Sequence, residues 1–140
     1  MALVGDRLVV AWTSAHGGQP SFGTVSVQAF TLDGSPAGPA QDLDGLATTA
    51  LGGIDVIAAG DRALVAWVGA PEPNTARQAR ARLVSTAGEP VGEALEVGTW
   101  RQVWGLRLVA TSAGALVVMS GNHMLNARYR IDAVPLTCAP

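Results

Sequence analysis

Cysteine is nearly absent from this chain. The only one is Cys138, close to the end of the 140-residue sequence. A single cysteine excludes an intrachain disulfide and a zinc site built from thiolates. We expect Cys138 to be a tail thiol without a structural role, with pairing to another chain as the alternative.

Charge and lysine are also scarce. Charged residues make up 14% of the chain, all nine basic residues are arginine, and the formal net charge is −2. This balance excludes a basic nucleic-acid surface, and an apolar fraction of 49% excludes an intrinsically disordered chain. We therefore expect a folded domain with no nucleic-acid partner.

Long apolar runs are missing as well. No run approaches the roughly 20 residues that a membrane helix requires, so we expect no membrane span. Residues 1–4 (Met-Ala-Leu-Val) lack the charged and apolar regions of a signal peptide. The sequence therefore predicts no export signal in these first residues.

Glycine and proline, in contrast, are abundant. The 17 glycines and eight prolines are too many for a helical bundle and are typical of a turn-dense β protein. The length corresponds to one ordinary domain. We predict a single all-β domain over residues 1–140.

An internal repeat organises the sequence. Residues 5–12 (Gly-Asp-Arg-Leu-Val-Val-Ala-Trp) and residues 60–67 (Gly-Asp-Arg-Ala-Leu-Val-Ala-Trp) agree at six of eight positions, 55 residues apart. A Gly-x-Pro-x-Gly pattern at residues 34–38 recurs 54 residues later at residues 88–92. Two matches at nearly the same spacing indicate repeated structural units.

A third unit follows the pattern loosely. Residues 115–117 (Ala-Leu-Val) repeat residues 63–65 at a spacing of 52, but the Gly-x-Pro-x-Gly turn is missing. We place the units at about residues 1–47, 48–100 and 101–140. Residues 1–4 are shorter than their counterpart at residues 54–59, so the first unit is expected to be clipped.

Each unit is predicted to form about four strands. Residues 63–68 are apolar throughout, which is typical of a strand covered on both faces, whereas residues 78–83 alternate as a strand with unlike faces does. Trp12 and Trp67 occupy equivalent positions and are expected to fill the space between sheets. The predicted strands are residues 7–13, 24–29, 41–43, 54–59, 63–68, 78–83, 94–97, 106–111, 115–120 and 126–131, with residues 98–105 as a link.

Four strands in about 50 residues is the size of a β-propeller blade. We therefore predict three four-stranded antiparallel repeats forming a partial propeller, with a compact β-sandwich as the alternative. Three blades do not close a ring, and each terminal blade would leave an apolar face uncovered. We expect self-association or a partner chain to cover these faces, for instance two chains in a six-bladed ring. A segment of a longer propeller is the other explanation.

The sequence pattern of the repeat resembles a known type of protein repeat. Asp-Arg before residues 8–12 (Leu-Val-Val-Ala-Trp), an alternating strand, and Asp-Gly-x-Pro-x-Gly at residues 33–38 are similar to the propeller-type repeats of large secreted or surface proteins of myxobacteria and related bacteria. The similarity covers residues 3–98 well and residues 106–131 loosely, because the third unit lacks the Asp-Arg, the Trp and the Asp-Gly turn. The resemblance implies a propeller or partial propeller that binds or scaffolds, and an extracellular or cell-surface location.

Candidate ligand-binding residues follow from that architecture. In a propeller, the loops after the second and fourth strands share one rim, where ligands usually bind. Trp100 and Trp104 interrupt a link of small residues, so we interpret them either as a stacking platform for a sugar or peptide or as a plug between the second and third units. The candidate rim residues are His16, Asn74, Arg77, Trp100, Arg101, Trp104 and His123.

No motif predicts catalysis, a metal or a cofactor. His16 and His123 lack a third ligand, and residues 42–45 lack the spaced oxygens of a calcium loop. No nucleophile elbow, phosphate-binding loop or dinucleotide fingerprint is present. The arginine pairs at residues 80 and 82 and at residues 128 and 130 form either an anion-binding row or a solvated strand face paired with glutamates.

Three functions remain open at this point. We predict a non-enzymatic binding or scaffolding module that acts in protein–protein interaction or assembly. The alternatives are a lectin-like carbohydrate binder and a fragment of a larger propeller enzyme.

Overall fold

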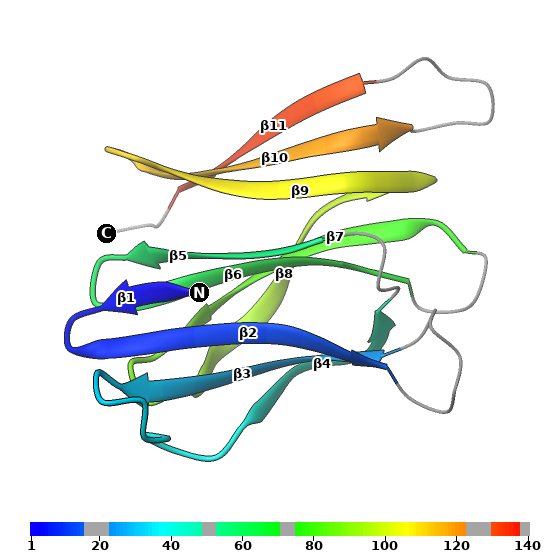
Figure 1. Ribbon diagram of the computed structural model, residues 1–140. Helices are drawn as coiled ribbons and strands as arrows, with labels where there is room; N and C mark the ends of the chain where they lie inside the picture. Colours follow the sequence, from blue (N-terminus) through cyan, green and yellow to red (C-terminus); the bar gives the residue numbers. More distant parts are fainter. Residues whose placement is uncertain (16–22, 49–52, 71–74, 123–129, 138–140) are drawn as a thin grey trace.

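The computed structural model describes residues 1–15, 23–48, 53–70, 75–122 and 130–137. These residues form eleven β-strands and no helix, which confirms the predicted all-β class (Figure 1). The strands form three antiparallel sheets, which we name sheets A, B and C. In each sheet, strands that follow one another in the chain lie side by side.

Sheets A and B have four strands each, and sheet C has three. Sheet A contains β1 (Ala2–Val4), β2 (Arg7–Ala15), β3 (Gly23–Thr31) and β4 (Gln41–Thr48). Sheet B contains β5 (Ile54–Ala59), β6 (Arg62–Gly69), β7 (Arg77–Val84) and β8 (Pro90–Trp100). Sheet C contains β9 (Gln102–Thr111), β10 (Gly114–Asn122) and β11 (Arg130–Thr137), so the third unit has no fourth strand in the described part of the chain.

Sheet B lies between the other two sheets (Figure 1). The alternation of strand β6 explains this position, since successive side chains of a strand point to opposite faces. Val65 and Trp67 are buried in the core between sheets A and B, whereas Leu64 and Val68 are buried in the core between sheets B and C. The unbroken apolar run of β6 therefore reflects burial on both faces, as predicted.

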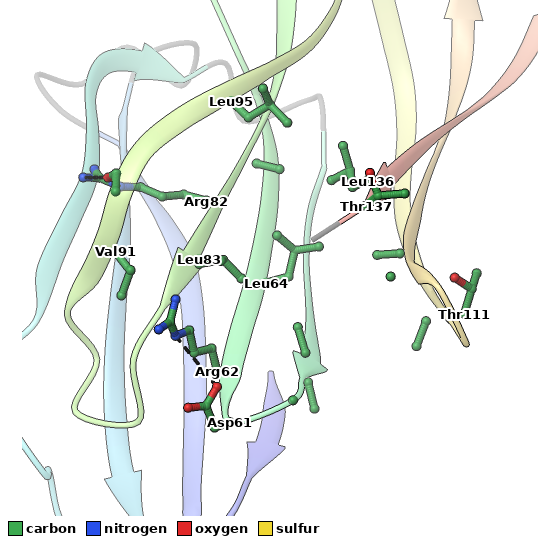
Figure 2. A pocket seen from close by; sticks show the side chains of 18 of the residues that line it. Asp61, Arg62, Leu64, Arg82, Leu83, Val91, Leu95, Thr111, Leu136 and Thr137 are labelled. Atoms are coloured by element: carbon green, nitrogen blue, oxygen red, sulfur yellow. Dashed lines mark hydrogen bonds and ion pairs between the residues drawn. The ribbon is translucent and has the colours of Figure 1, made fainter. Parts of the chain in front are cut away.

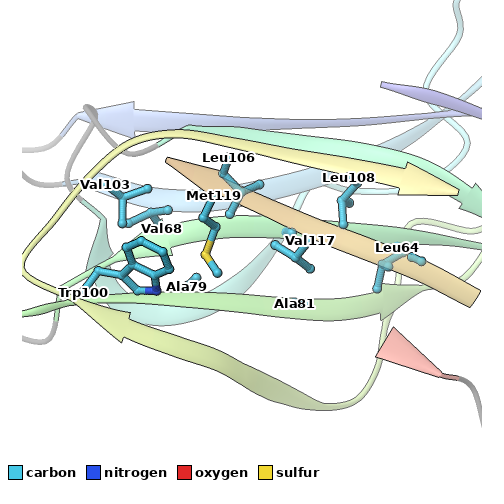
Figure 3. Close-up of a cluster of buried hydrophobic side chains, with 12 residues drawn as sticks. Leu64, Val68, Ala79, Ala81, Trp100, Val103, Leu106, Leu108, Val117 and Met119 are labelled. Carbon is cyan, nitrogen blue, oxygen red and sulfur yellow. The ribbon is translucent and has the colours of Figure 1, made fainter. Parts of the chain in front are cut away.

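Figure 3 shows the core between sheets B and C. Trp100 from the end of β8 lies there with Val103 of β9 and Met119 of β10. Met119 is fully buried on the face that Trp67 occupies in sheet B. The third unit thus uses a smaller, flexible side chain at the place of the missing tryptophan.

Two turns of the same build follow β3 and β7. The backbone N of Gly34 donates to the carbonyl of Thr31 at 2.9 Å, and the backbone N of Gly88 donates to the carbonyl of Ser85 at 3.0 Å. Both glycines have positive φ, 87° and 85°, a conformation that glycine adopts without a steric penalty. The Gly-x-Pro-x-Gly pattern therefore marks the tight connection into the fourth strand of sheets A and B.

The predicted end of the strand at residues 126–131 was wrong, because the strand continues beyond residue 131. Residues 126–129 lie outside the described residues, and the third strand of sheet C is β11 (Arg130–Thr137). Val134 of β11 pairs with Val117 of β10. In sheet B, the corresponding pair is Arg82 of β7 and Val65 of β6. Arg130 therefore does not repeat Arg82, because the apolar pairing of β11 with β10 sets the register and extends the strand toward the C-terminus.

The predicted link at residues 98–105 was also wrong. Strand β8 continues to Trp100 and strand β9 begins at Gln102, so only Arg101 separates them. The small residues of this segment suggested a loop. Burial of Trp100 and Val103 in the core between sheets B and C accounts for the extended strands instead.

Candidate functional site: two uncovered sheet faces

The outward side of sheet A is its first uncovered surface. On strand β2, Val9 points into the core between sheets A and B, so Leu8, Val10 and Trp12 point to the opposite side. Leu3 of β1 pairs with Leu8 and lies on the same side, where it is 56% exposed. We call this surface, formed by Leu3, Leu8, Val10 and Trp12, the A face.

Sheet B contains the matching sequence positions in a covered setting. Ala63, Val65 and Trp67 of β6 correspond to Leu8, Val10 and Trp12 in the sequence match, and all three are fully buried against sheet A. Leu8, Val10 and Trp12 of the A face are only half-buried. The difference arises because sheet A covers sheet B, while no described residue forms a sheet over the A face.

The outward side of sheet C is the second uncovered surface. Strand β10 points Val117 into the core and Leu116 and Val118 to the outside, where they are half-buried. Val109 of β9 pairs with Leu116 and is 46% exposed. We call the surface formed by Val109, Leu116, Val118 and the exposed Ile131 the C face.

Trp104 borders the C face. Strand β9 has a bulge between the residues that pair with Ser120 and Gly121, and Trp104 lies at this irregularity. Its ring is 44% exposed and lines a hollow of about 500 Å³ together with Val118 and Ile131. Of the predicted pair Trp100 and Trp104, Trp104 is thus the tryptophan with an exposed ring.

The exposed area of the chain is larger than expected for a compact monomer. The chain exposes 7687 Å². A folded monomer of 14.3 kDa is expected to expose about 6,800 Å². The excess of roughly 900 Å² is in the direction that uncovered sheet faces predict.

The outer part of the A face is polar and internally bonded. The Ser26 hydroxyl donates to the Asp42 carboxylate at 2.8 Å, and the Gln28 amide donates to the carbonyl of Gly38 at 2.8 Å. These groups lie beside the apolar strip of β2, because Ser26 pairs with Trp12 and Gln28 with Val10. The apolar part of this side of sheet A lies on β1 and β2 and continues onto β3 at Phe30, which pairs with Leu8 and is half-buried.

Of the other sequence-predicted rim residues, the structure describes Trp100, Arg77 and Arg101. Trp100 is 2% exposed and fills the core between sheets B and C, so it is unavailable as a stacking platform. Arg77 faces Trp100 across the β7–β8 pair and is half-buried, whereas Arg101 is exposed in the single-residue connection to β9. His16, Asn74 and His123 lie outside the described residues.

Arg82 has a role that the sequence did not predict. Its guanidinium donates to the carbonyl of Leu43 in sheet A at 2.9 Å and, through Nε, to the carbonyl of Gly92 in its own sheet at 2.8 Å. The bond to Leu43 joins sheets A and B and the bond to Gly92 holds the guanidinium within sheet B, so Arg82 is a structural residue and not part of an anion-binding row. Arg130 forms an ion pair with Asp132 at 3.0 Å.

The structure describes no metal centre and no membrane helix. Within the described ranges, no three His, Cys, Asp or Glu side chains gather in a way that could hold a metal ion. No helix among the described residues is long and apolar enough to cross a bilayer.

No protein-family model, curated protein or solved structure matches this chain.

Sequence reasoning predicted uncovered faces but not their residues. The signal was present in the octapeptide match, because Trp12 and Trp67 are the same residue in the same pattern. What was missing was the face to which each tryptophan points, and this depends on which sheet packs against which.

Proposed function

We propose that this chain is a non-catalytic, β-propeller-like assembly module in which the C face of one copy packs against the A face of another. Its sheets act as blades, and its role is to bind or scaffold through the assembly. The proposal commits to a second copy of the chain as the partner of both faces.

One observation carries the proposal. Trp67 is fully buried under sheet A, while Trp12, in the matching octapeptide, is half-buried on a face that no described sheet covers. The internal contacts supply a template for the missing cover, since sheet B packs Ala63, Val65 and Trp67 against the side of sheet A that carries Val9 and Ala11. The C face of a second copy offers the equivalent side, with Leu116 and Val118 in the places of Leu64 and Ala66.

The pairing is head to tail, because the A face and the C face are different surfaces. Head-to-tail contacts generate a ring when the rotation between units closes and a filament when it does not. Two copies would bring six sheets, which falls within the four to eight blades of known propellers. A closed pair is therefore the assembly that we expect.

The test uses substitutions at side chains that are already exposed. Leu3→Glu places a charge on the A face and Val109→Glu places one on the C face, where the side chains are 56% and 46% exposed. Leu32→Glu is the matched control, because Leu32 is exposed in the turn after β3 and belongs to neither face. Light scattering on the purified chains should show assembly for the wild type and for Leu32→Glu, and monomers for the two face variants.

Mixing the two face variants distinguishes head-to-tail packing from a symmetric contact. A Leu3→Glu chain keeps an intact C face, and a Val109→Glu chain keeps an intact A face. The mixture should therefore form a two-chain complex through one native interface, although neither variant assembles alone. A monomeric wild type at about 100 μM, or a mixture that stays monomeric, would refute the proposal.

A further inference from the structure

Sheet C ends at strand β11, where sheets A and B each continue with a fourth strand. In the described part of the chain, no strand pairs with the outer edge of β11. An edge strand presents backbone donors and acceptors that another strand can use. Residues 133–137 of β11 therefore form an edge to which a strand can be added.

Between sheets A and B, fourth strands close the outer end of the gap. Leu43 of β4 is buried in the core there, and Ala94 of β8 packs against the same cluster. The turn before β8 lies directly on β3, since a Cβ added to Gly88 would come within 2.8 Å of the backbone N of Ala29. This end of the A–B interface is thus filled by the chain itself.

The corresponding end between sheets B and C is open. A cleft of about 760 Å³ lies there, with Leu83, Val91 and Leu95 of sheet B on one wall and Leu136 and Thr137 of β11 on the other (Figure 2). Leu95 is 55% exposed in this cleft although it lies on a strand next to a buried core. The cleft borders β11, the strand beside which a fourth strand of sheet C would lie.

The polar groups of the cleft do not favour a small polar ligand. Arg62 and Asp61 form an exposed ion pair with a distance of 3.8 Å at the mouth. The guanidinium of Arg82 is bonded to the carbonyls of Leu43 and Gly92. Small-molecule pockets usually place a few polar groups so that they converge on the ligand. The lining also contains Glu93, Thr111 and Thr137, and the backbone edge of β11 lies beside the apolar wall.

We propose that the cleft binds an extended peptide segment of another chain, which adds to β11 as the fourth strand of sheet C. Aliphatic side chains at alternate positions of the segment would lie over Leu83, Val91 and Leu95, as expected for strand addition with side-chain pockets. The chain's own β8 is the template for the chemistry of this segment, because it fills the fourth position in sheet B. This inference uses neither the A-face pairing nor the C-face pairing and does not depend on the proposed assembly.

Pro135 controls which strands can add. It lies in β11 opposite Leu116, and a proline within a sheet is confined to edges where its missing N–H faces away from the neighbouring strand. The open edge therefore lacks one donor, which disfavours pairing through the backbone alone and so protects the edge from aggregation. A segment that also packs on the apolar wall gains binding free energy from apolar burial, which the backbone edge alone does not provide.

The probe is a fluorescein-labelled peptide with the sequence of residues 90–100, titrated with the full chain and followed by fluorescence anisotropy. Leu95→Glu should weaken binding at least tenfold, whereas Leu32→Glu should leave it unchanged. Both leucines are exposed, so neither change removes core packing. Pro135→Thr should strengthen binding severalfold, because it restores one N–H on the edge.

Hydrogen exchange locates the bound peptide. Binding at the cleft should slow exchange of the amides of residues 133–137 and leave the outer edges of β4 and β8 unchanged. Absence of binding, equal affinity for the wild type and Leu95→Glu, or protection at β4 or β8 instead of β11 would overturn the inference. Because Leu3→Glu and Val109→Glu leave the cleft intact, peptide binding by these variants is expected even if the chain does not self-associate.

Discussion

The carboxylate of Asp55 on β5 accepts a hydrogen bond from the backbone N of Leu108 on β9, with 2.9 Å between Oδ2 and N. Its other oxygen, Oδ1, accepts from the backbone N of Val56 at 2.9 Å. One side chain thus joins the first strands of sheets B and C. The bond satisfies a backbone donor at the side of the interface where these two strands meet.

Removal of this carboxylate should destabilise the fold. Asp55→Ala leaves the N–H of Leu108 without its partner, and an unsatisfied donor at such a position costs about 1–3 kcal/mol. We expect the free energy of unfolding in urea to fall by that amount. Asp6→Ala is the control, since the exposed Asp6 forms only a surface ion pair with Arg7 at 3.7 Å, and its loss should cost less than ~1 kcal/mol. Equal losses for the two variants would contradict the bridging role of Asp55.

The two matching tryptophans should differ in their contribution to stability. Trp67→Ala removes a fully buried ring, and such truncations cost about 3–5 kcal/mol. Trp12→Ala removes a half-buried ring and should cost about half as much or less in the monomer. Urea unfolding of Leu3→Glu chains that carry either substitution measures the difference without a contribution from assembly.

Trp67→Phe should be tolerated much better than Trp67→Ala. The Trp67 indole N–H is buried and finds no hydrogen-bond partner among the described residues. Phenylalanine loses some ring contacts but also removes this unsatisfied donor, so the two effects offset each other. We expect the free energy of unfolding in urea to change by less than about 2 kcal/mol. A loss as large as that of Trp67→Ala would show that the unpaired indole N–H does not destabilise the fold.

Two glycines of the same turn type should respond differently to alanine. Gly34 and Gly88 both have positive φ, so either substitution carries a backbone cost of about 1–2 kcal/mol. A Cβ at Gly34 meets nothing within 4 Å, whereas a Cβ at Gly88 would come within 2.8 Å of the backbone N of Ala29. Gly88→Ala should therefore lower the thermal midpoint clearly more than Gly34→Ala, and equal shifts would argue against close packing of this turn on β3.

Asp33 should titrate below its usual range. A hydrogen bond from the Thr31 hydroxyl, followed by bonds from the backbone N and the side chain of Ser35, lowers the pKa of the Asp33 carboxyl. Because the pKa is lower in the folded state, the stabilisation is present above the unfolded pKa and is lost as pH falls through the folded pKa. NMR titration should give a higher pKa for Asp33 in Thr31→Val, and an unchanged pKa would remove Thr31 as the cause.

Much of the fold could be predicted from short-range patterns. The predicted strand at residues 54–59 coincides with β5, and the runs at residues 63–68 and 78–83 lie within β6 and β7. These segments were predictable because alternation and unbroken apolar runs report burial directly. The turns at Gly34 and Gly88 were predictable for a similar local reason, since positive φ requires glycine.

Other features depended on contacts between distant residues. The end of β11 was missed because Asn126 to Ile131 alternates as a strand does, whereas the observed register follows the pairing of Val134 and Leu136 with β10. Trp100 fitted a loop by composition, but it extends β8 into the core between sheets B and C. In each case a partner far away in the sequence decided between two locally acceptable structures.

The sequence by itself determined that this chain forms β-strands, where most of them lie, and that strand β6 must be covered on both faces. Only the tertiary structure decided that Trp67 is buried while Trp12 stays half-exposed, and that the third sheet leaves an open edge beside a cleft. The physical reason is that a side chain's polarity states whether it needs burial, but the surface that buries it is supplied by another sheet. The local sequence pattern therefore shows which side chains favour burial, and the packing of the sheets shows which of these side chains remain exposed.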